Sequence, residues 1–324
     1  MQKKILIYNS GGGLGDAIQL FPLILSLKKH FKNCKFFYLG AHENHFNNKL
    51  KDYKLQIESV NLDFRYFGFR WWHLLQIRKV ISEKEIDKFF LIIDLQSKIR
   101  NTLILKRIPT NNFFSSTFNF FFCTKKNKYL NRTANISLLT LSNLEIFLNT
   151  KINRINFDHT TLDLMYLKEA EKLLPEKNYI GFSITQGNEY RKKSWPLENF
   201  IGLANKYILA GKKVVFFIER SNVKLINSIK NKIPSAIFPE SLSIISSPAL
   251  VTALAVRLER SISIDNGIMH MIALAGTPMT VLFGPTNSKK FSPNRSNVKV
   301  LDSKDLYKSN NISKITIDDV FNCS

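Results

Sequence analysis

The sequence predicts an α/β fold with two domains, in each of which parallel strands alternate with helices. Short, continuous apolar runs of strand length recur along the chain, as expected for strands buried on both faces. Most of these runs end in polar residues or glycine and are followed directly by a helical pattern. With 324 residues, the chain is long enough for two full-sized hydrophobic cores.

The composition limits the classes of partner. The formal charge of +22 indicates attraction to nucleic acid, to an anionic membrane surface or to a phosphorylated substrate. No nucleic-acid-binding signature accompanies this charge, so we expect no nucleic acid partner. The three cysteines include no CxxC pair, which fits a reducing compartment and argues against a disulfide framework or a structural zinc site. No apolar run is long enough to span a membrane and the chain starts with a strand pattern, so we expect a cytoplasmic protein.

The first strand, residues 4–8, ends in a glycine cluster that leads into a helix from Ala17. Gly13 and Gly15 in this cluster permit a tight turn and a close approach of the backbone to a ligand. Asp16 is expected at the start of the helix, beside the rim of the sheet. Its structural alternative is an acidic residue that only interacts with the helix dipole. The cluster is a poor dinucleotide fingerprint, because no acidic residue follows the second strand, residues 36–39, in a convincing position.

A further strand, residues 89–95, ends at Asp94 and Gln96, and Arg100 lies in the opening of the next helix. Polar groups therefore collect again at the carboxyl end of a strand. In open α/β sheets this is the rim at which ligands bind. The first half of the chain is thus predicted to be a βα-repeating domain with ligand-binding groups along one rim.

Two segments of the first half are rich in aromatic residues. Residues 64–80 mix aromatics with Arg and Lys, which suits a membrane interface or, alternatively, a helix packed on its own domain. Residues 111–123 are expected to form either a core strand pair or an exposed loop that touches a lipid-like partner. A polar stretch without periodicity, residues 148–162, is the predicted boundary between domains of residues 1–155 and 156–324.

The second domain is predicted to restart with a helix over residues 164–174 and a strand over 179–184. The following loop contains Thr185, Gln186 and Lys193 and leads through Trp-Pro into a helix over residues 197–209. Lys193 is the cation best placed to meet a phosphate, although lysine-rich loops are common in this chain. A strand over residues 213–218 ends at Glu219, whose carboxylate can accept hydrogen bonds from a ribose.

Residues 261–286 combine two strand ends with a helix start. The first strand stops at Asp265, Asn266 and Gly267, a helix with His270 on its first turn follows, and a strand over residues 279–283 ends at Gly284, Pro285 and Thr286. Such a strand-to-helix turn directs free backbone N–H groups and the positive end of the helix dipole to the rim, where a phosphate would bind. The alternative is that Asp265 and Asn266 only cap the helix and His270 is a core residue. Beyond residue 301 we expect a short polar tail.

Together these motifs resemble the heptosyltransferases, the inverting sugar transferases that build the inner core of bacterial lipopolysaccharide. The resemblance spans nearly the whole chain. Its motifs, in order, are Gly15-Asp16 followed by Pro22, the strand end at Asp94 and Gln96, Lys193-Ser194-Trp195-Pro196, Glu219, and Asp265 to His270 followed by Gly284-Pro285-Thr286. It implies a GT-B architecture, in which two Rossmann-like domains face each other across a cleft. The first domain would hold the acceptor and the second the nucleotide sugar, typically ADP-heptose.

The resemblance also implies a role for each matched residue. Asp16 would be the general base, and Lys193 with the backbone N–H groups near Gly267 would neutralise the leaving diphosphate, with no metal ion or other cofactor. The donor-binding residues would be Thr185, Gln186, Lys193, Glu219, Asp265, Asn266, Gly267, His270, Gly284, Pro285 and Thr286. The acceptor-binding residues would be Gly13, Gly15, Asp94, Gln96 and Arg100.

The chain departs from the family pattern at two positions. Asn266 stands where the family usually has a hydroxyl residue, and Asn9 stands where many members have a basic one. An anionic saccharide or glycolipid acceptor at the inner face of the cytoplasmic membrane would account for the positive charge. The alternatives are a glycosyltransferase of the same fold with another nucleotide sugar, a nucleotide-cofactor oxidoreductase, and a non-catalytic anion-binding adaptor.

Overall fold

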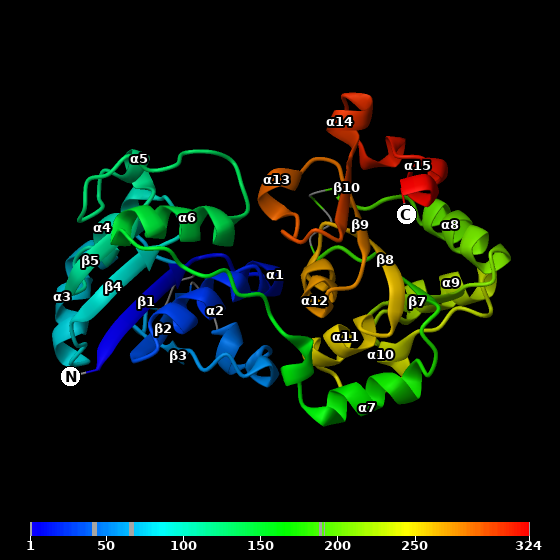
Figure 1. Ribbon diagram of the computed structural model, residues 1–324, viewed down its shortest axis with the longest axis horizontal. Coiled ribbons are helices and arrows are strands. Elements are labelled where there is room, and N and C mark those ends of the chain that lie inside the picture. The colour runs from blue at the N-terminus through cyan, green and yellow to red at the C-terminus, as the bar shows by residue number, and fades with distance from the viewer. Residues whose placement is uncertain (1, 41–43, 65–67, 188–189, 191, 324) are drawn as a thin grey trace. The chain divides into compact units, whose positions relative to one another are not determined.

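The computed structural model describes residues 2–40, 44–64, 68–187, 190 and 192–323, and it divides into two compact units, Met1–Asn156 and Phe157–Ser324 (Figure 1). Each unit contains a five-stranded sheet whose paired strands all run parallel. The α/β class predicted from the sequence is therefore confirmed. The chain passes from one unit to the other after Asn156, within the polar stretch that follows helix α6 (Ile136–Leu148).

The sheet of the first unit has the strand order β3-β2-β1-β4-β5. Its strands are β1 (Lys3–Asn9), β2 (Cys34–Gly40), β3 (Glu58–Ser59), β4 (Phe89–Asp94) and β5 (Thr110–Ser115). Its other helices are α1 (Leu14–Ile18), α2 (Phe21–His30), η1 (His45–Asn47), η2 (Lys51–Tyr53), α3 (His73–Glu83), α4 (Ile99–Leu105) and α5 (Thr117–Phe120). The direction in which successive strands are added reverses between β1 and β4. That reversal is the topological switch point at which doubly wound sheets bind ligands.

The sheet of the second unit has the order β10-β9-β8-β6-β7. Its strands are β6 (Tyr179–Ser183), β7 (Lys213–Phe217), β8 (Leu258–Ile264), β9 (Met279–Phe283) and β10 (Val298–Asp302). Its helices are η3 (His159–Thr161), α7 (Leu164–Leu173), α8 (Leu197–Leu209), α9 (Val223–Lys232), α10 (Pro239–Leu242), α11 (Pro248–Ala255), α12 (Gly267–Ala275), α13 (Ser288–Phe291), α14 (Ser303–Tyr307), η5 (Ile312–Lys314) and α15 (Ile317–Cys323).

A single parallel bridge extends this second sheet at its β7 edge, where Ile237 pairs with Val215. Counting this bridge, the order by position in the chain is 3-2-1-4-5-6, which is the order of dinucleotide-binding Rossmann sheets. The switch point then lies between β6 and β8, which are direct neighbours. The loops after these two strands are the ones that the sequence predicted to bind a phosphate.

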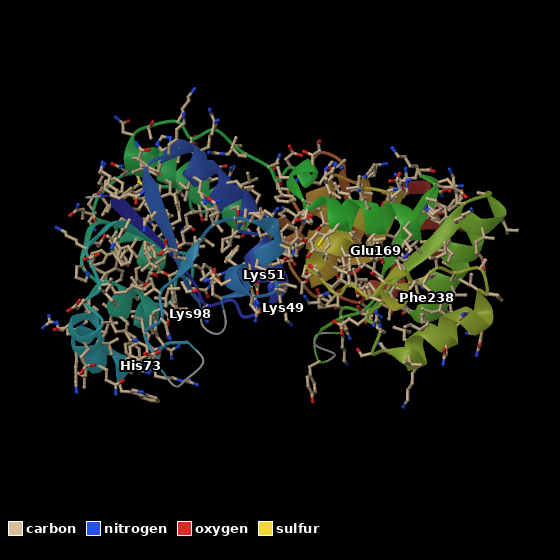
Figure 2. All side chains as sticks on the ribbon, turned by 90° about the horizontal axis from the view of Figure 1, so that it is seen from below. Lys49, Lys51, His73, Lys98, Glu169 and Phe238 are labelled. Carbon is tan, nitrogen blue, oxygen red and sulfur yellow. The ribbon has the colours of Figure 1, made fainter. Side chains whose placement is uncertain are left out.

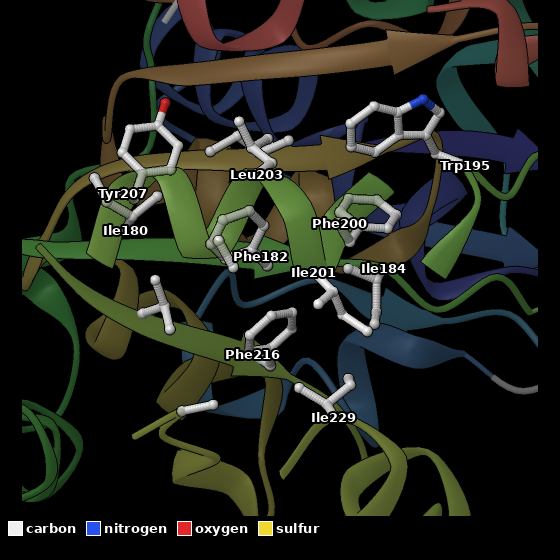
Figure 3. Close-up of a cluster of buried hydrophobic side chains, with 14 of the residues drawn as sticks. Ile180, Phe182, Ile184, Trp195, Phe200, Ile201, Leu203, Tyr207, Phe216 and Ile229 are labelled. Carbon is white, nitrogen blue, oxygen red and sulfur yellow. The ribbon is translucent and has the colours of Figure 1, made fainter. Parts of the chain in front are cut away.

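The core of the second unit fixes the loop that follows β6. Figure 3 shows Phe182 of β6 packed among side chains of β7 and α8, and its ring stacks on that of Phe216 with centroids 5.0 Å apart. Trp195, at the end of the loop, is buried, and its indole N–H donates to Ile315 O at 2.8 Å. The loop is therefore held at both ends by buried groups, which limits where Lys193 can lie.

The first helical segment differs from the prediction. The sequence predicted one helix from Ala17, but α1 begins at Leu14 and the chain breaks at Gln19 and Leu20 before α2. Pro22 explains the break, because a proline is favoured in the first turn of a helix and cannot donate to the turn before it. Asp16 therefore lies in a separate helix of five residues that follows the glycine loop.

The segment of residues 111–123 is neither of the two predicted forms. It forms one strand, β5, followed by the short turn α5, and both buried and exposed rings occur in it. Phe113, Phe114 and Phe120 are buried, whereas Phe118 and Phe121 are about two-thirds exposed. Of the other aromatic stretch, residues 65–67 lie outside the described residues, and the remainder leads into α3.

The predicted polar tail is wrong. Residues after 301 form α14, η5 and α15, and Val320 of α15 is fully buried in the core of the second unit. Phe321 packs on Tyr207 of α8, with ring centroids 5.2 Å apart. Among the helices of the described residues, none is both long and apolar enough to cross a membrane.

Candidate functional site

A hydrogen-bond network crosses the switch point of the first unit. Gln96, which follows β4, donates from Nε2 to Asn9 Oδ1 at 2.6 Å and accepts at Oε1 from the Ser10 hydroxyl at 2.7 Å. Asn9 Oδ1 also accepts from the backbone N–H of Gly11 at 3.0 Å. The carboxyl ends of β1 and β4 are thus joined by amide side chains, which set the path of the glycine loop.

The glycine loop wraps around the carboxylate of Asp16. The backbone N–H of Gly13 donates to Asp16 Oδ2 at 3.2 Å, and Gly15 lies in the same short helix. A Cβ atom added to Gly11 would lie 2.9 Å from the Cβ and Cγ atoms of Asp16, closer than real Cβ contacts occur. A side chain at position 11 would therefore have to displace either the Asp16 carboxylate or the loop. The carboxylate itself is only half-buried, at the rim of the sheet.

Asp94 lies beneath this rim rather than on it. It is 1% exposed, and its oxygens accept from the hydroxyls of Thr102 at 2.6 Å and Ser115 at 2.8 Å and from Gln96 N at 3.0 Å. Burial raises the pKa of this carboxyl, and these three hydrogen bonds oppose the rise. Asp94 therefore influences the rim through the backbone of Gln96 that it holds.

Arg100 lies on the first turn of α4 and is half-buried. The charge of Arg100 acts on His73 and on Tyr8. Burial lowers the pKa of His73, and the charges of Arg100 and then Arg70 lower it further. Burial also raises the pKa of Tyr8, an effect that Arg100 opposes. The first unit thus holds a carboxylate, an amide and a guanidinium along one side of its sheet. These groups can bind a hydroxylated or anionic ligand.

Asn266 joins the two strands that flank the switch point of the second unit. Its side-chain Nδ2 donates to Ser183 Oγ and to Thr185 O, both at 2.8 Å. Its Oδ1 accepts from Met269 N at 2.8 Å and so caps α12, which begins at Gly267. The capping role that the sequence left open for Asn266 is real, and the same side chain also ties β6 to β8. Because α12 begins directly after Asn266, the positive end of its dipole lies at the rim.

Lys193 lies beside this helix start. Its Nζ is 2.5 Å from Asp265 Oδ2 and 3.4 Å from the Asp265 backbone oxygen, and its backbone N–H donates to Gln186 Oε1 at 2.9 Å. The two side chains are 13% and 8% exposed, so this is a largely buried ion pair. Residues 188, 189 and 191 of the same loop lie outside the described residues.

His270 lies on the first turn of α12 and is buried. Burial lowers its pKa to about 4, although the charge of Asp265 acts in the opposite direction. The imidazole is therefore neutral at physiological pH. In that form it can both donate and accept a hydrogen bond, but it supplies no positive charge to a phosphate.

The remaining predicted donor residues follow β7 and β9. Glu219 is exposed beyond the end of β7. A Cβ atom on Gly284 would lie 3.0 Å from Asn310 O and from Ile312 N, so the turn after β9 is packed against the backbone before η5. Pro285 is exposed, and the hydroxyl oxygen of Thr286 is buried without a hydrogen-bond partner. A buried hydroxyl in this state is a group that a ligand can satisfy.

Sequence reasoning missed three polar groups at these rims. Asn9 and Ser183 are buried and hold the two switch points, and Glu240 of α10 approaches Glu219 closely enough for the two charges to interact. Asn9 was visible only as a departure from the family pattern, and Glu240 had no sequence signal. In the described ranges, no group of three or more His, Cys, Asp or Glu side chains is arranged to hold a metal ion.

Comparison with solved structures identifies the class of fold. A glycosyltransferase family 9 protein from Veillonella parvula matches with a TM-score of 0.69 and 19% identity, over 99% of this chain and 95% of that one. The E. coli heptosyltransferase WaaC with ADP matches with a TM-score of 0.66 and 14% identity, over 99% and 96% of the two chains. E. coli ADP-heptose lps heptosyltransferase II matches with a TM-score of 0.66 and 15% identity, over the same shares. The two Rossmann-like units thus define the GT-B class of glycosyltransferase folds.

The family follows from the sequence itself. The model of glycosyltransferase family 9 (heptosyltransferase) matches residues 142–319, more than half of the chain. This protein belongs to glycosyltransferase family 9, and it is a glycosyltransferase. Among curated proteins, no sequence matches the chain. The oxidoreductase and adaptor alternatives are left without support.

Proposed function

We propose that this enzyme transfers a heptose from ADP-heptose to a saccharide of the lipopolysaccharide inner core, with inversion at the transferred carbon and with Asp16 as general base. The observation that carries the donor half of this proposal is the position of Lys193. Its ammonium group lies beside the start of α12, at the switch point of a Rossmann sheet. A cation and a helix N-terminus together favour a diphosphate. The structural neighbours include WaaC with ADP and with an ADP-heptose analogue, which supports the choice of ADP.

The remaining donor contacts are assigned by position on the same rim. Glu219 would accept from the ribose hydroxyls, as an acidic residue does at the end of the second strand of other Rossmann sheets. Asp265 and His270 would orient the sugar-phosphate portion, and Thr286 would donate its unpartnered hydroxyl to it. Thr185, Gln186, Gly267, Gly284 and Pro285 would shape the surface around the diphosphate. The leaving charge would be neutralised by Lys193 and backbone N–H groups without a metal ion.

The first unit would bind the acceptor. Asp16 is half-buried and accepts from the glycine loop, so its carboxylate is oriented and still able to reach solvent. A base in this position would remove the proton of the attacking hydroxyl as the bond to the sugar forms. Gly13, Gly15, Gln96 and Arg100 would contact the acceptor, and Asp94 would support Gln96. The acceptor would be anionic and membrane-linked, which suits a chain with a formal charge of +22.

Calorimetry with ADP, UDP, GDP and NAD tests the donor assignment. We expect the wild-type protein to select ADP, and Lys193→Ala and Glu219→Ala to weaken ADP binding by about tenfold or more, because each removes a charged contact. Lys299→Ala and Glu259→Ala are matched controls, since both residues lie at strand positions away from this rim. A preference for UDP or GDP would retain the enzyme class and replace the donor. Retention of full ADP affinity by both rim variants would contradict the proposed site.

A further inference from the structure

The segment before α10 brings a second carboxyl group to the rim beside Glu219. Ile237 pairs with Val215 of β7 in parallel, with Phe216 N donating to Ile237 O at 2.9 Å and Ile237 N donating to Val214 O at 3.0 Å. Parallel pairing directs both chains toward the same rim. Glu219 follows the paired residue of β7 by four positions, and Glu240 follows Ile237 by three. Both residues therefore follow the bridge toward the same edge of the sheet. They lie close enough there for the charge of Glu219 to act on Glu240.

Helix α10, which carries Glu240, is held from both ends. The ring of Phe238, labelled in Figure 2, stacks on Phe216 with centroids 5.9 Å apart. At the other end, Ser243 Oγ donates to Glu169 of α7 at 2.7 Å. Glu169 is labelled in the same view. Because its backbone is anchored on β7 and on α7, Glu240 has little freedom to move away from Glu219.

The surroundings of Glu240 disfavour a negative charge on it. Its Oε1 atom is buried without a hydrogen-bond partner, as is the hydroxyl oxygen of the neighbouring Ser241. An ionised oxygen without a donor is costly in such a place, whereas a neutral carbonyl oxygen is tolerated. A proton on Oε2 would leave Oε1 as the neutral carbonyl oxygen that such a place tolerates, and the residue as a whole is half-buried.

The ionisable groups on the elements that touch α10 also bear on the charge of Glu240. Glu219 and Arg220 follow β7, Glu169 lies on α7, and Lys213, at the far end of β7, is paired with Glu176. Burial raises the pKa of Glu240 to about 7, and the charge of Glu219 adds to the rise. A carboxyl group that holds its proton can donate a hydrogen bond, whereas an ionised one can only accept.

We propose that Glu240 is a second nucleoside-contacting residue of the donor site, which donates a hydrogen bond from its protonated carboxyl while the neighbouring Glu219 accepts one. This inference rests on the proposed function, because it takes the rim beyond β7 to hold the nucleoside. A ribose hydroxyl oxygen or a ring nitrogen of the base is the acceptor that such a group fits. Ionisation of Glu240 removes the donor and places a second negative charge beside a nucleotide. Donor affinity then falls as the carboxyl loses its proton.

Calorimetric titration with ADP tests this at pH 6.0 and at pH 8.5 on the wild-type protein, Glu240→Gln and Glu240→Ala. The terminal phosphate of ADP titrates in the same range, so proteins are compared at each pH rather than one protein across pH. We expect Glu240→Gln, which keeps a donor at every pH, to match the wild type at pH 6.0 and to bind about tenfold more tightly at pH 8.5. Glu240→Ala should bind more weakly than Glu240→Gln at both pH values.

Glu259→Gln, the same change on an exposed carboxylate of β8, is the matched control and should follow the wild type throughout. A ratio of wild-type to Glu240→Gln affinity that does not change with pH would overturn the proposal, as would ADP binding by Glu240→Ala equal to that of the wild type at pH 6.0. If ADP, UDP and GDP all fail to bind the wild-type protein, the nucleotide site itself is wrong and this inference falls with it. Nucleotide binding that is indifferent to Glu240 would overturn this inference alone.

Discussion

Lys193 and Asp265 form a largely buried ion pair in the second unit, with Lys193 Nζ 2.5 Å from Asp265 Oδ2. The pair joins the loop after β6 to the residue that follows β8, so it lies at the switch point, at the carboxyl edge of the sheet. It also means that the cation proposed to meet a diphosphate is already neutralised by a carboxylate. A diphosphate must share this lysine with Asp265 or replace the carboxylate as its partner.

Asp265→Asn should therefore strengthen ADP binding and weaken the fold. Removing the carboxylate leaves Lys193 free to pair with phosphate, and we expect ADP affinity to rise by about threefold to tenfold. The free energy of unfolding should fall by about 3 kcal/mol, because a buried charge loses its partner. Calorimetry and urea denaturation measure the two effects. Asp318→Asn, which breaks an exposed pair with Lys206, should change neither, and a loss of ADP affinity in Asp265→Asn would show that the pair binds phosphate as a unit.

Asp16→Asn should abolish most turnover and leave the nucleotide site intact. The amide keeps the shape of the side chain and can still accept from Gly13 N, but it cannot take a proton. General-base catalysis contributes about 10²–10⁴ in rate, which sets the expected loss. Sugar transfer is assayed beside ADP affinity, and Glu58→Gln, an exposed carboxylate on β3, is the control. Turnover within a few-fold of the wild type would remove Asp16 from the mechanism.

Gly11→Ala should lower turnover without a matching loss of stability. The added Cβ would lie 2.9 Å from the Cβ and Cγ atoms of Asp16, so either the carboxylate or the loop has to move. Misplacing a reacting group by about 1 Å costs about 10²-fold in rate. Gly13→Ala is the graded comparison, because its Cβ would meet only Asp16 Oδ2, at 3.1 Å. Equal turnover in both variants, or a large fall in thermal stability for either, would contradict this account of the loop.

The sequence predicted the elements whose signals are local. The strand Met279–Phe283 and the helix Leu197–Leu209 have the predicted bounds, since the first is a mostly apolar run that stops at a glycine and the second starts directly after a proline. The C-terminal helix α15 was missed because it is only seven residues long, too short for its apolar residues to repeat at helical spacing, and only Val320 in it is fully buried. Its place in the core depends on α8, more than a hundred residues earlier, as the link between Lys206 and Asp318 also shows.

The candidate site also contains residues that local sequence signals predict and contacts that they do not. Asp265 could be selected because an apolar run stops at it, and Asp16 because it follows a glycine cluster at the start of a helix. The ion pair between Lys193 and Asp265 could not be predicted, because the two residues are 72 positions apart and meet only when β6 and β8 pair. Glu240 reaches the rim through a one-residue bridge that leaves no periodic pattern in the sequence. Such contacts depend on the sheet order rather than on local propensity.

The exposed face of α3 should hold the protein on anionic vesicles. Trp71 and Trp72, directly before α3, are 55% and 48% exposed, and Leu75 of α3 is 82% exposed. Arg78 and Lys79 of the same helix are also exposed. Aromatic rings and cations of this kind bind at the headgroup level of anionic lipid. We expect vesicles to retain the wild-type protein at low salt and Trp71→Ala/Trp72→Ala to bind them about tenfold more weakly.

The control for vesicle binding is Leu209→Ala, which removes an exposed apolar side chain from α8 in the other unit. It should bind vesicles like the wild type. If vesicles retain the tryptophan variant as well as the wild type, the membrane contact lies elsewhere in the protein. Failure of the wild type to bind at low salt would remove the membrane from the proposed function.

His270 should make the protein sensitive to acid. Its pKa is about 4 in the folded protein and about 6.5 in an unfolded chain, so between these values the unfolded state binds a proton that the folded state refuses. Stability present above pH 6.5 is then lost as the pH falls toward 4, by up to about 3 kcal/mol. Urea denaturation at pH 7.0 and pH 4.5 should show a smaller difference for His270→Asn than for the wild type, even though the variant is less stable at pH 7.0. His159→Asn, the same change on the half-buried turn η3, should show the same difference in stability between the two pH values as the wild type. If His270→Asn also shows the wild-type difference, groups other than His270 cause the acid response.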